Sequence, residues 1–264
     1  MRDRFMSSIF TLVAVLAFAA DAPAQTAQRP AALGLKAIPR TPDGKPDLSG
    51  VWLRESPTDT RKRLGLPNRA EGGDPERGAN LPFQPTARKM FEYHRDPLQP
   101  GRSRNELNPR ATRCFPPDLQ YLMLNDNDHI EILQNPARVL MIFEYDFWVR
   151  QVWIDDQHPE DPEVKWMGHS TGKWDGDTLV VDTVAIDDRN SYGGFLHSDV
   201  LHLIERIRRV DHNLLENVIT VDDPKTYTKP WTMEPAYYNL KPNARIEERV
   251  WCNERYNQGI WYGE

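Results

Sequence analysis

From about residue 128 onward, apolar and polar residues alternate with the two-residue period of β-strands. The stretch 137–155 is dense in β-branched and aromatic residues and is interrupted near Asp146, which predicts a hairpin. A second hairpin is predicted around Asp175-Gly176, because Asp-Gly favours a tight turn between strands. The runs at 201–210 and 214–221, separated by Asp211-His212-Asn213, predict a third hairpin. Three further runs of the same kind lie at 166–174, 231–240 and 245–253.

Seven or eight antiparallel strands are therefore expected, joined by short polar turns with little helix between them, and a further strand at 48–54 would complete a small barrel. The expected fold is therefore mainly β, as a closed antiparallel barrel or a sandwich. Closure favours the barrel, because it removes the edges that such aromatic strands would expose. One short helix is predicted at 85–93, capped by Thr86. A barrel of this size can enclose one small ligand.

The N-terminal part of the chain differs from the strand region. Residues 1–24 combine Arg2 and Arg4 with an apolar run at 8–20 and a small-residue cleavage pattern, which predicts a signal peptide and export to the periplasm or beyond. An uncleaved anchor is the alternative. A proline-rich tether at 25–46 follows, and a single barrel domain at 47–264 carries an irregular insertion at about 55–128.

Composition narrows the classes of function. The chain of 264 residues has a net charge of −6, a mean hydropathy of −0.68 and a pI near 5.7. We therefore expect no membrane span, which would need a long apolar run, and no nucleic-acid partner, which would need a basic stripe on the surface. Cys114 and Cys252 are the only cysteines, and export would let them form a disulfide; two separate thiols are the alternative.

Two resemblances extend this reading. The Gly50-x-Trp52 pair opening the first strand resembles the signature of lipocalin and calycin-like barrels, which implies that Trp52 plugs the closed end under an arginine from the last strand, here Arg249. The stretches 166–183, 197–206 and 222–231 resemble a family of exported bacterial proteins of unknown function. That second resemblance covers more of the chain, but it implies no activity.

Strand parity selects candidate polar residues inside the barrel. Asp182 lies between Val180 and Val184, and Glu205 between Leu203 and Ile207. Glu144 and Glu248 receive the same inward assignment. Such acids either form buried ion pairs with Arg150, Arg206 or Arg249, or act as a general acid or base with a pKa raised by the apolar wall.

Histidines near these acids complete a candidate site. His197 and His202 flank the start of one strand, and His169 lies in the loop Met167-Gly168-His169-Ser170. Solvation or turn capping would also explain each histidine taken singly. The candidate catalytic residues are His197, His202, Asp182 and Glu205, and the candidate ligand-binding residues are Tyr145, Arg150, Trp153, His169 and Trp231.

No nucleophile elbow, phosphate-binding loop, dinucleotide fingerprint or zinc-protease motif occurs, and no cofactor or metal is expected. Two functions remain open. The first is an exported barrel that binds a largely apolar or aromatic small molecule. The second is a cofactor-independent acid–base enzyme, such as an isomerase, cyclase, lyase or hydratase, acting on such a molecule. An exposed tryptophan row for carbohydrate is a further alternative, and the sequence does not predict the oligomeric state.

Overall fold

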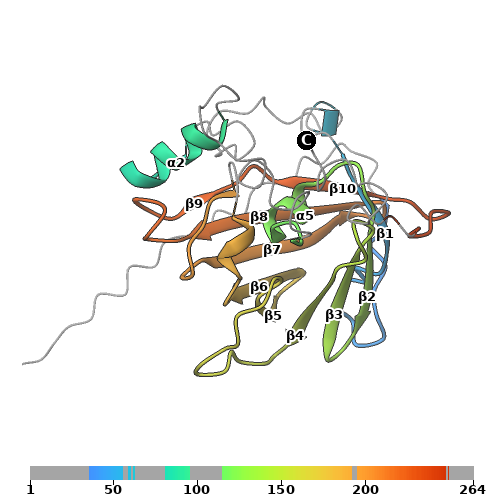
Figure 1. Ribbon diagram of the computed structural model, residues 1–264. Helices are drawn as coiled ribbons and strands as arrows, with labels where there is room; N and C mark the ends of the chain where they lie inside the picture. The colour runs from blue at the N-terminus through green and yellow to red at the C-terminus, as the bar shows by residue number, and fades with distance from the viewer. Residues whose placement is uncertain are drawn as a thin grey trace, which may run out of the picture. The chain divides into compact units, whose positions relative to one another are not determined.

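The computed structural model describes residues 36–55, 59, 60, 62, 81–95, 115–191, 195–247 and 249. Within these residues, ten strands form one continuous sheet, accompanied by two α-helices and one short 3-10 helix (Figure 1). The elements are β1 (Gly50–Glu55), α2 (Pro85–Arg95), α5 (Leu119–Leu124), β2 (Ile130–Asn135), β3 (Arg138–Phe143), β4 (Val149–Ile154), β5 (His169–Asp175), β6 (Thr178–Val184), η1 (Asp188–Asn190), β7 (His202–Asp211), β8 (Leu214–Asp222), β9 (Trp231–Thr232) and β10 (Ala236–Leu240).

The sheet closes into a barrel because β10 pairs with both β1 and β8. The ring consists of β1 to β8 and β10, and the two-residue β9 pairs with β8 on the same edge as β10, farther along that strand. The mainly-β barrel predicted from the sequence is confirmed. It is not antiparallel throughout, because β4 and β5 run parallel. A closed ring of nine strands cannot alternate direction at every step, since alternation requires an even number of strands.

The three predicted hairpins are present as β3–β4, β5–β6 and β7–β8. The predicted first strand is β1, and the predicted helix at 85–93 is α2. Three elements escaped the pattern, namely β2, α5 and η1, and the single strand predicted at 231–240 is divided into β9 and β10. The expected last strand at 245–253 is not formed where it is described: residues 245–247 are irregular and Arg249 makes an isolated bridge to Tyr145.

Trp52 is completely buried at one end of the barrel, where its indole N–H donates to the carbonyl of Leu48 at 3.0 Å. The arginine over its ring is Arg209 of β7, with its guanidinium carbon 5.1 Å from the ring centroid. The expected partner, Arg249, instead pairs with Asp128. The assignment to Arg249 was therefore wrong, because the arginine that reaches Trp52 comes from β7, where its guanidinium also donates to the carbonyls of Asp47 and His212.

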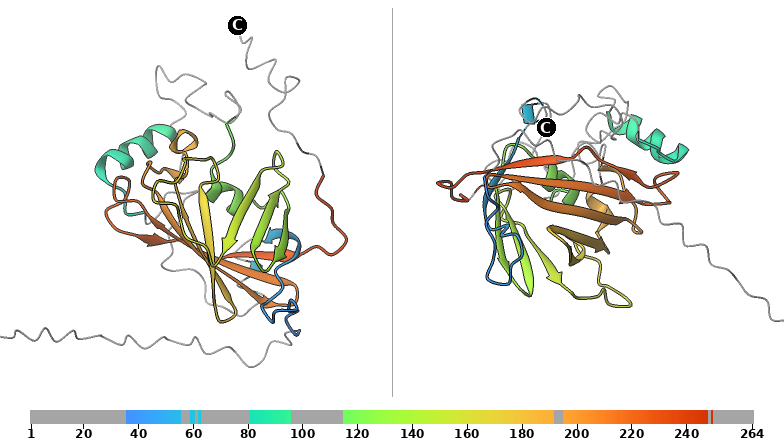
Figure 2. Two further views of the ribbon diagram at one scale, coloured as in Figure 1. Left: turned by 90° about the horizontal axis from the view of Figure 1, so that it is seen from below. Right: turned by 180° about the vertical axis from the view of Figure 1, so that it is seen from behind.

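Helix α5 contributes to the barrel interior (Figure 2). Its Leu119, Leu122, Met123 and Leu124 are buried, and the hydroxyl of Tyr238 donates to the carbonyl of Met123. A void of about 10 Å³ lies between Met123, Trp52 and Met141. That volume is about what a single water molecule needs. This part of the interior is therefore filled by protein side chains.

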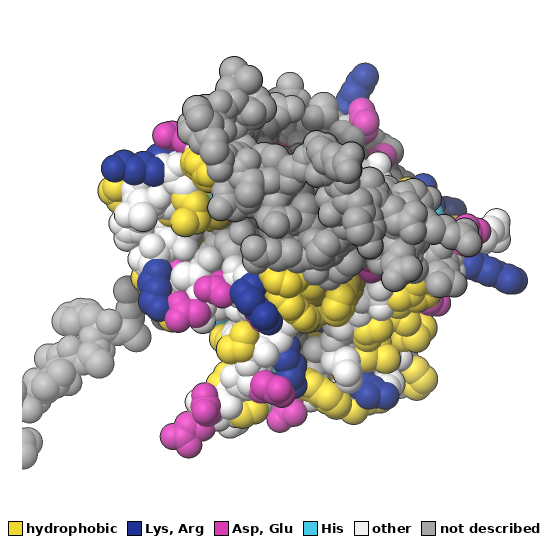
Figure 3. All heavy atoms as spheres, in the orientation of Figure 1, with side chains coloured by type: hydrophobic (Ala, Val, Ile, Leu, Met, Phe, Trp, Pro, Cys, Tyr) yellow, Lys and Arg dark blue, Asp and Glu magenta, His cyan; other side chains and the backbone are white. Residues whose placement is uncertain are grey.

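The outer surface of the barrel is not uniformly polar. Apolar side chains gather over β2, β3 and the turn into β4, at the lower right of Figure 3. Leu133, Phe147 and Val149 belong to this surface and are 45%, 43% and 47% exposed. None of the helices in the described part of the chain is long and apolar enough to cross a bilayer.

Candidate functional site

The predicted catalytic residues lie on two different faces of the barrel wall. Along β6, and along β7 as far as Arg209, buried residues alternate with less buried ones, so that Glu205 points inward while Asp182 and His202 lie on the outer face. The inward assignment of Glu205 is confirmed and that of Asp182 is wrong. The valines on either side of Asp182 are themselves half-buried residues of the outer face, so they do not mark the core side of β6.

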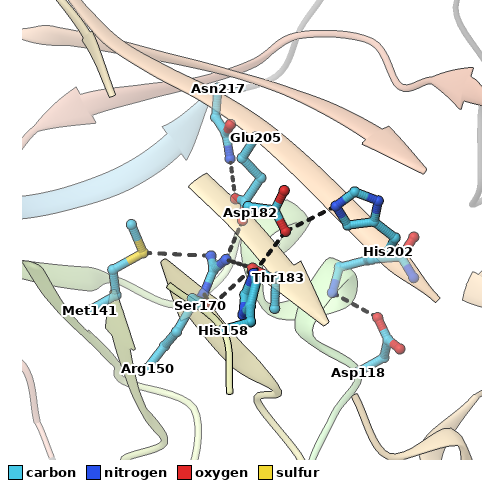
Figure 4. Close-up of polar contacts among 11 residues, drawn as sticks. Asp118, Met141, Arg150, His158, Ser170, Asp182, Thr183, His202, Glu205 and Asn217 are labelled. Atoms are coloured by element: carbon cyan, nitrogen blue, oxygen red, sulfur yellow. Dashed lines mark hydrogen bonds and ion pairs between the residues drawn. The ribbon is translucent and has the colours of Figure 1, made fainter. Parts of the chain in front are cut away.

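On the outer face, Asp182 joins two histidines (Figure 4). Its Oδ1 lies 2.9 Å from Nε2 of His202 and 2.9 Å from Nε2 of His158. The second ring nitrogen of His158, Nδ1, lies 2.8 Å from Nδ1 of His169. Four side chains from three strands and one loop thus form a continuous hydrogen-bonded row, which we call the histidine row: His169, His158, Asp182 and His202.

The sequence builds this row through the one parallel pair of strands. Parallel neighbours cannot be joined by a tight turn, so the chain needs a long connection, here residues 155–168, to return to the start of β5. This connection carries His158 to the outer face, against Thr171 of β5 at 3.4 Å. Sequence reasoning missed His158. The available signal was the length of the segment between two predicted strands, which is too great for a hairpin.

The row contains groups whose pKa values move in opposite directions. The hydrogen bond with His202 lowers the pKa of Asp182 and, from the other side, the same bond raises the pKa of His202. Burial is the main cause that lowers the pKa of His169. These shifts stabilise the ionised form of Asp182, the protonated form of His202 and the neutral form of His169. The side chains remain accessible, with 41% of Asp182, 33% of His202 and 24% of His158 exposed.

The row does not have the arrangement of a metal centre. Among the described residues, no group of three or more His, Cys, Asp or Glu side chains is placed to hold a metal ion.

Inside the barrel, Glu205 forms an ion pair with Arg150, and each side chain is only 1% exposed. Arg150 also donates to Ser170 at 3.1 Å and Thr183 at 2.8 Å, while Asn217 donates to Glu205 at 2.8 Å (Figure 4). This polar belt crosses β4 to β8. The charges of Arg150 and Glu205 therefore compensate each other, which agrees with the buried ion pair that the sequence offered as one alternative.

His197, the remaining catalytic candidate, lies apart from the row in a buried pair with Asp118, with Nε2 and Oδ2 2.8 Å apart. Asp118 also caps the N-terminus of α5 by accepting from the amide of Gln120. Burial alone would lower the pKa of His197, but the hydrogen bond and charge of Asp118 outweigh it, so the pKa is raised. The pair links α5 to the segment before β7.

The predicted ligand-binding residues do not converge on one pocket. His169 belongs to the histidine row and Arg150 to the polar belt. Trp153 is half-buried, and the guanidinium carbon of Arg138 lies 5.9 Å from the centroid of its ring. Trp231 is buried, with its ring edge-on to that of Tyr227. The ring of Tyr145 is edge-on to that of Tyr121, and its backbone forms an isolated bridge with Arg249.

Glu144 is another carboxylate that strand parity predicted to point inward. It is buried and accepts hydrogen bonds from the backbone N–H and the ring of His129. Glu248, Cys114 and Cys252 lie outside the described residues, as does the predicted signal peptide. The disulfide therefore stays a prediction.

Comparisons with protein-family models, with curated proteins and with solved structures gave no match. The functional argument therefore depends on the geometry of the site.

Proposed function

We propose that this protein is an acid–base catalyst and that its site is the histidine row on the outer wall of the barrel. The single observation that carries the proposal is that Asp182 accepts hydrogen bonds from both His158 and His202 at 2.9 Å, in a row that ends in His169. A neutral histidine and a protonated histidine in one row supply a base and an acid at the same pH.

The proposal modifies the candidate set. His202 and Asp182 keep the roles expected for them, His169 moves from ligand binding to proton transfer, and His158 is added. Glu205 and His197 receive structural roles, because each is buried against an opposite charge that satisfies it.

A closed barrel is compatible with small-molecule binding. Enclosure of an apolar ligand inside it is the second proposal, and it has less support. The void between Trp52, Met123 and Met141 holds about 10 Å³, so a ligand there would have to displace side chains. We also propose export, supported by the pattern of residues 1–24; the mass of the mature chain from a bacterial periplasm tests it.

The acid–base proposal is tested with α-proton exchange of cyclohexanone in D2O, followed by NMR. General acid–base groups contribute about 10²- to 10⁴-fold to such transfers. We expect the protein to accelerate exchange and Asp182→Asn to lose at least about tenfold of that acceleration. Asp175→Asn is the matched control, because Asp175 lies on the adjacent strand in an exposed pair with Arg206.

Histidine titration by 15N NMR provides the second readout. His202 should titrate above and His169 below the ordinary histidine pKa of about 6.5. In Asp182→Asn, the pKa of His202 should fall back toward that value, since the carboxylate that raises it is gone. Equal exchange rates for the wild type and Asp182→Asn, or no acceleration by the wild type, would refute the proposal.

A further inference from the structure

The hydrogen bonds of the row determine where its protons lie. An ionised carboxylate only accepts, so Nε2 of His202 and Nε2 of His158 must both donate to Asp182. One proton lies between Nδ1 of His158 and Nδ1 of His169, and we place it on His169, so that Nδ1 of His158 accepts. His169 is consequently held as the Nδ1–H tautomer, with a bare Nε2 at one end of the row. A protonated His202 presents an N–H at Nδ1 at the other end.

These two ends lie on either side of one small apolar residue. His169 of β5 is the cross-strand partner of Val184 on β6. The β6–β7 register pairs Thr183 with Leu203, so its continuation by one residue places Val184 opposite His202. Adjacent strands lie about 4.8 Å apart, which puts the two histidine backbones about 10 Å apart with Val184 between them. All three residues are half-buried on the outer face.

The charges around the row bear on what can bind there. Asp156 and Lys165 act on His169, and Asp222 acts on His202. Together with Asp182 and a protonated His202, and with His158 neutral, three carboxylates act on the row against two cations. A substrate that carries a carboxylate or phosphate of its own would meet excess negative charge, whereas an uncharged molecule would not.

We propose that the histidine row acts on uncharged, enolisable carbonyl compounds that lie over Val184 and bridge His169 and His202. This inference rests on the proposed function and names its substrate class. Nε2 of His169 takes the α-proton, the electron pair of the broken C–H bond forms the C=C bond of the enol, and the C=O π-pair moves to oxygen. Nδ1 of His202 delivers its proton to that oxygen. The steps then reverse, or the proton returns to a different carbon of a conjugated system, which gives an isomer.

In this scheme His158 is a positioning residue, because it touches no substrate and acts by holding the tautomer of His169. In water neutral histidine prefers the Nε2–H form. We therefore expect 15N NMR to show His169 as the Nδ1–H tautomer in the wild type and as the Nε2–H tautomer in His158→Ala.

The decisive experiment measures α-deuteration of cyclohexanone and of 4-oxocyclohexanecarboxylate by the wild type, Val184→Trp and Val180→Trp. Val180 is the matched control, because it is half-buried on the same face of β6, four residues away. We expect Val184→Trp to lose at least about tenfold in kcat/KM while the histidine 15N signals keep the pattern of an intact row. We expect Val180→Trp to retain the wild-type rate, and the anionic ketone to react at least about tenfold more slowly than the neutral one.

Wild-type activity in Val184→Trp with an intact row, equal rates for the two ketones, or an Nε2–H tautomer at His169 in the wild type would overturn the inference. These outcomes can be told apart from failure of the proposed function, since exchange would then still depend on Asp182. If the wild type accelerates exchange of neither ketone, both proposals fall together.

Discussion

The Arg150–Glu205 pair allows the most quantitative test of the interior. Both side chains are 1% exposed, and Arg150 also donates to two hydroxyl groups, those of Ser170 and Thr183. Glu205→Gln keeps the size of the side chain but removes its charge, which leaves a buried guanidinium without a counter-charge. Breaking a buried pair in this way costs about 3–5 kcal/mol.

Urea unfolding followed by tryptophan fluorescence measures this loss. With a slope of about 3 kcal/mol per molar, the upper part of the usual range, the midpoint should fall by about 1–1.7 M. Glu216→Gln is the matched control: Glu216 also pairs with an arginine, Arg208, but that guanidinium is half-exposed. An exposed pair contributes at most about 1 kcal/mol, so the control should shift little.

The double variant Arg150→Met/Glu205→Met shows whether the stability loss comes from the unpaired charge or from disturbed packing. Replacing both charges by apolar side chains of similar size removes the unpaired charge, so the double variant should be more stable than Glu205→Gln. The reasoning is refuted if Glu205→Gln unfolds within about 1 kcal/mol of the wild type, or if the double variant is the less stable of the two. Exchange of cyclohexanone per folded molecule should not change in either, since Glu205 lies inside the barrel.

Two further predictions concern single residues. The raised pKa of His197 means that its pair with Asp118 stabilises the fold fully below the unfolded pKa of about 6.5, and that this contribution is lost as the pH rises through the folded pKa. Urea midpoints between pH 6 and pH 9 should therefore fall in the wild type and fall less in His197→Gln; parallel curves would contradict this. Gly168 has φ +64°, and a Cβ there would lie 2.6 Å from the carbonyl of Val184. We expect Gly168→Ala to cost more than about 2 kcal/mol and to perturb the His169 signals, whereas Gly176→Ala, at φ +58° with open space around it, should cost only about 1 kcal/mol. Equal thermal midpoints for the two alanine variants would contradict the assignment of a packed turn before β5.

The interior assignments show where strand parity works. Glu205 was placed inward because Leu203 and Ile207 share its face, and all three are buried. The same rule failed for Asp182, because the outer face of β6 also carries two branched apolar residues, Val180 and Val184, both half-buried. Apolar residues two positions away along a strand identify the face that points into the core only where the opposite face of that strand is polar. Here Val181 and Leu179 on the other face are apolar as well.

His158 could not be recognised from local pattern. Its partners are 11 and 24 residues away along the chain, and the contact depends on a parallel pair of strands. Likewise, the resemblance implied that Arg249 covers Trp52, and only the register of β7 brings Arg209 there instead.

The sequence by itself determined the class of fold, the three hairpins and the inward position of Glu205, because these follow from local alternation and turn chemistry, which act between residues close in the chain. Only the tertiary structure decided the parallel β4–β5 pair, the plugging of the interior by α5 and the meeting of His169, His158, Asp182 and His202. Those features follow from how nine strands close into a ring, and ring closure is a condition on the whole chain that no local stretch contains.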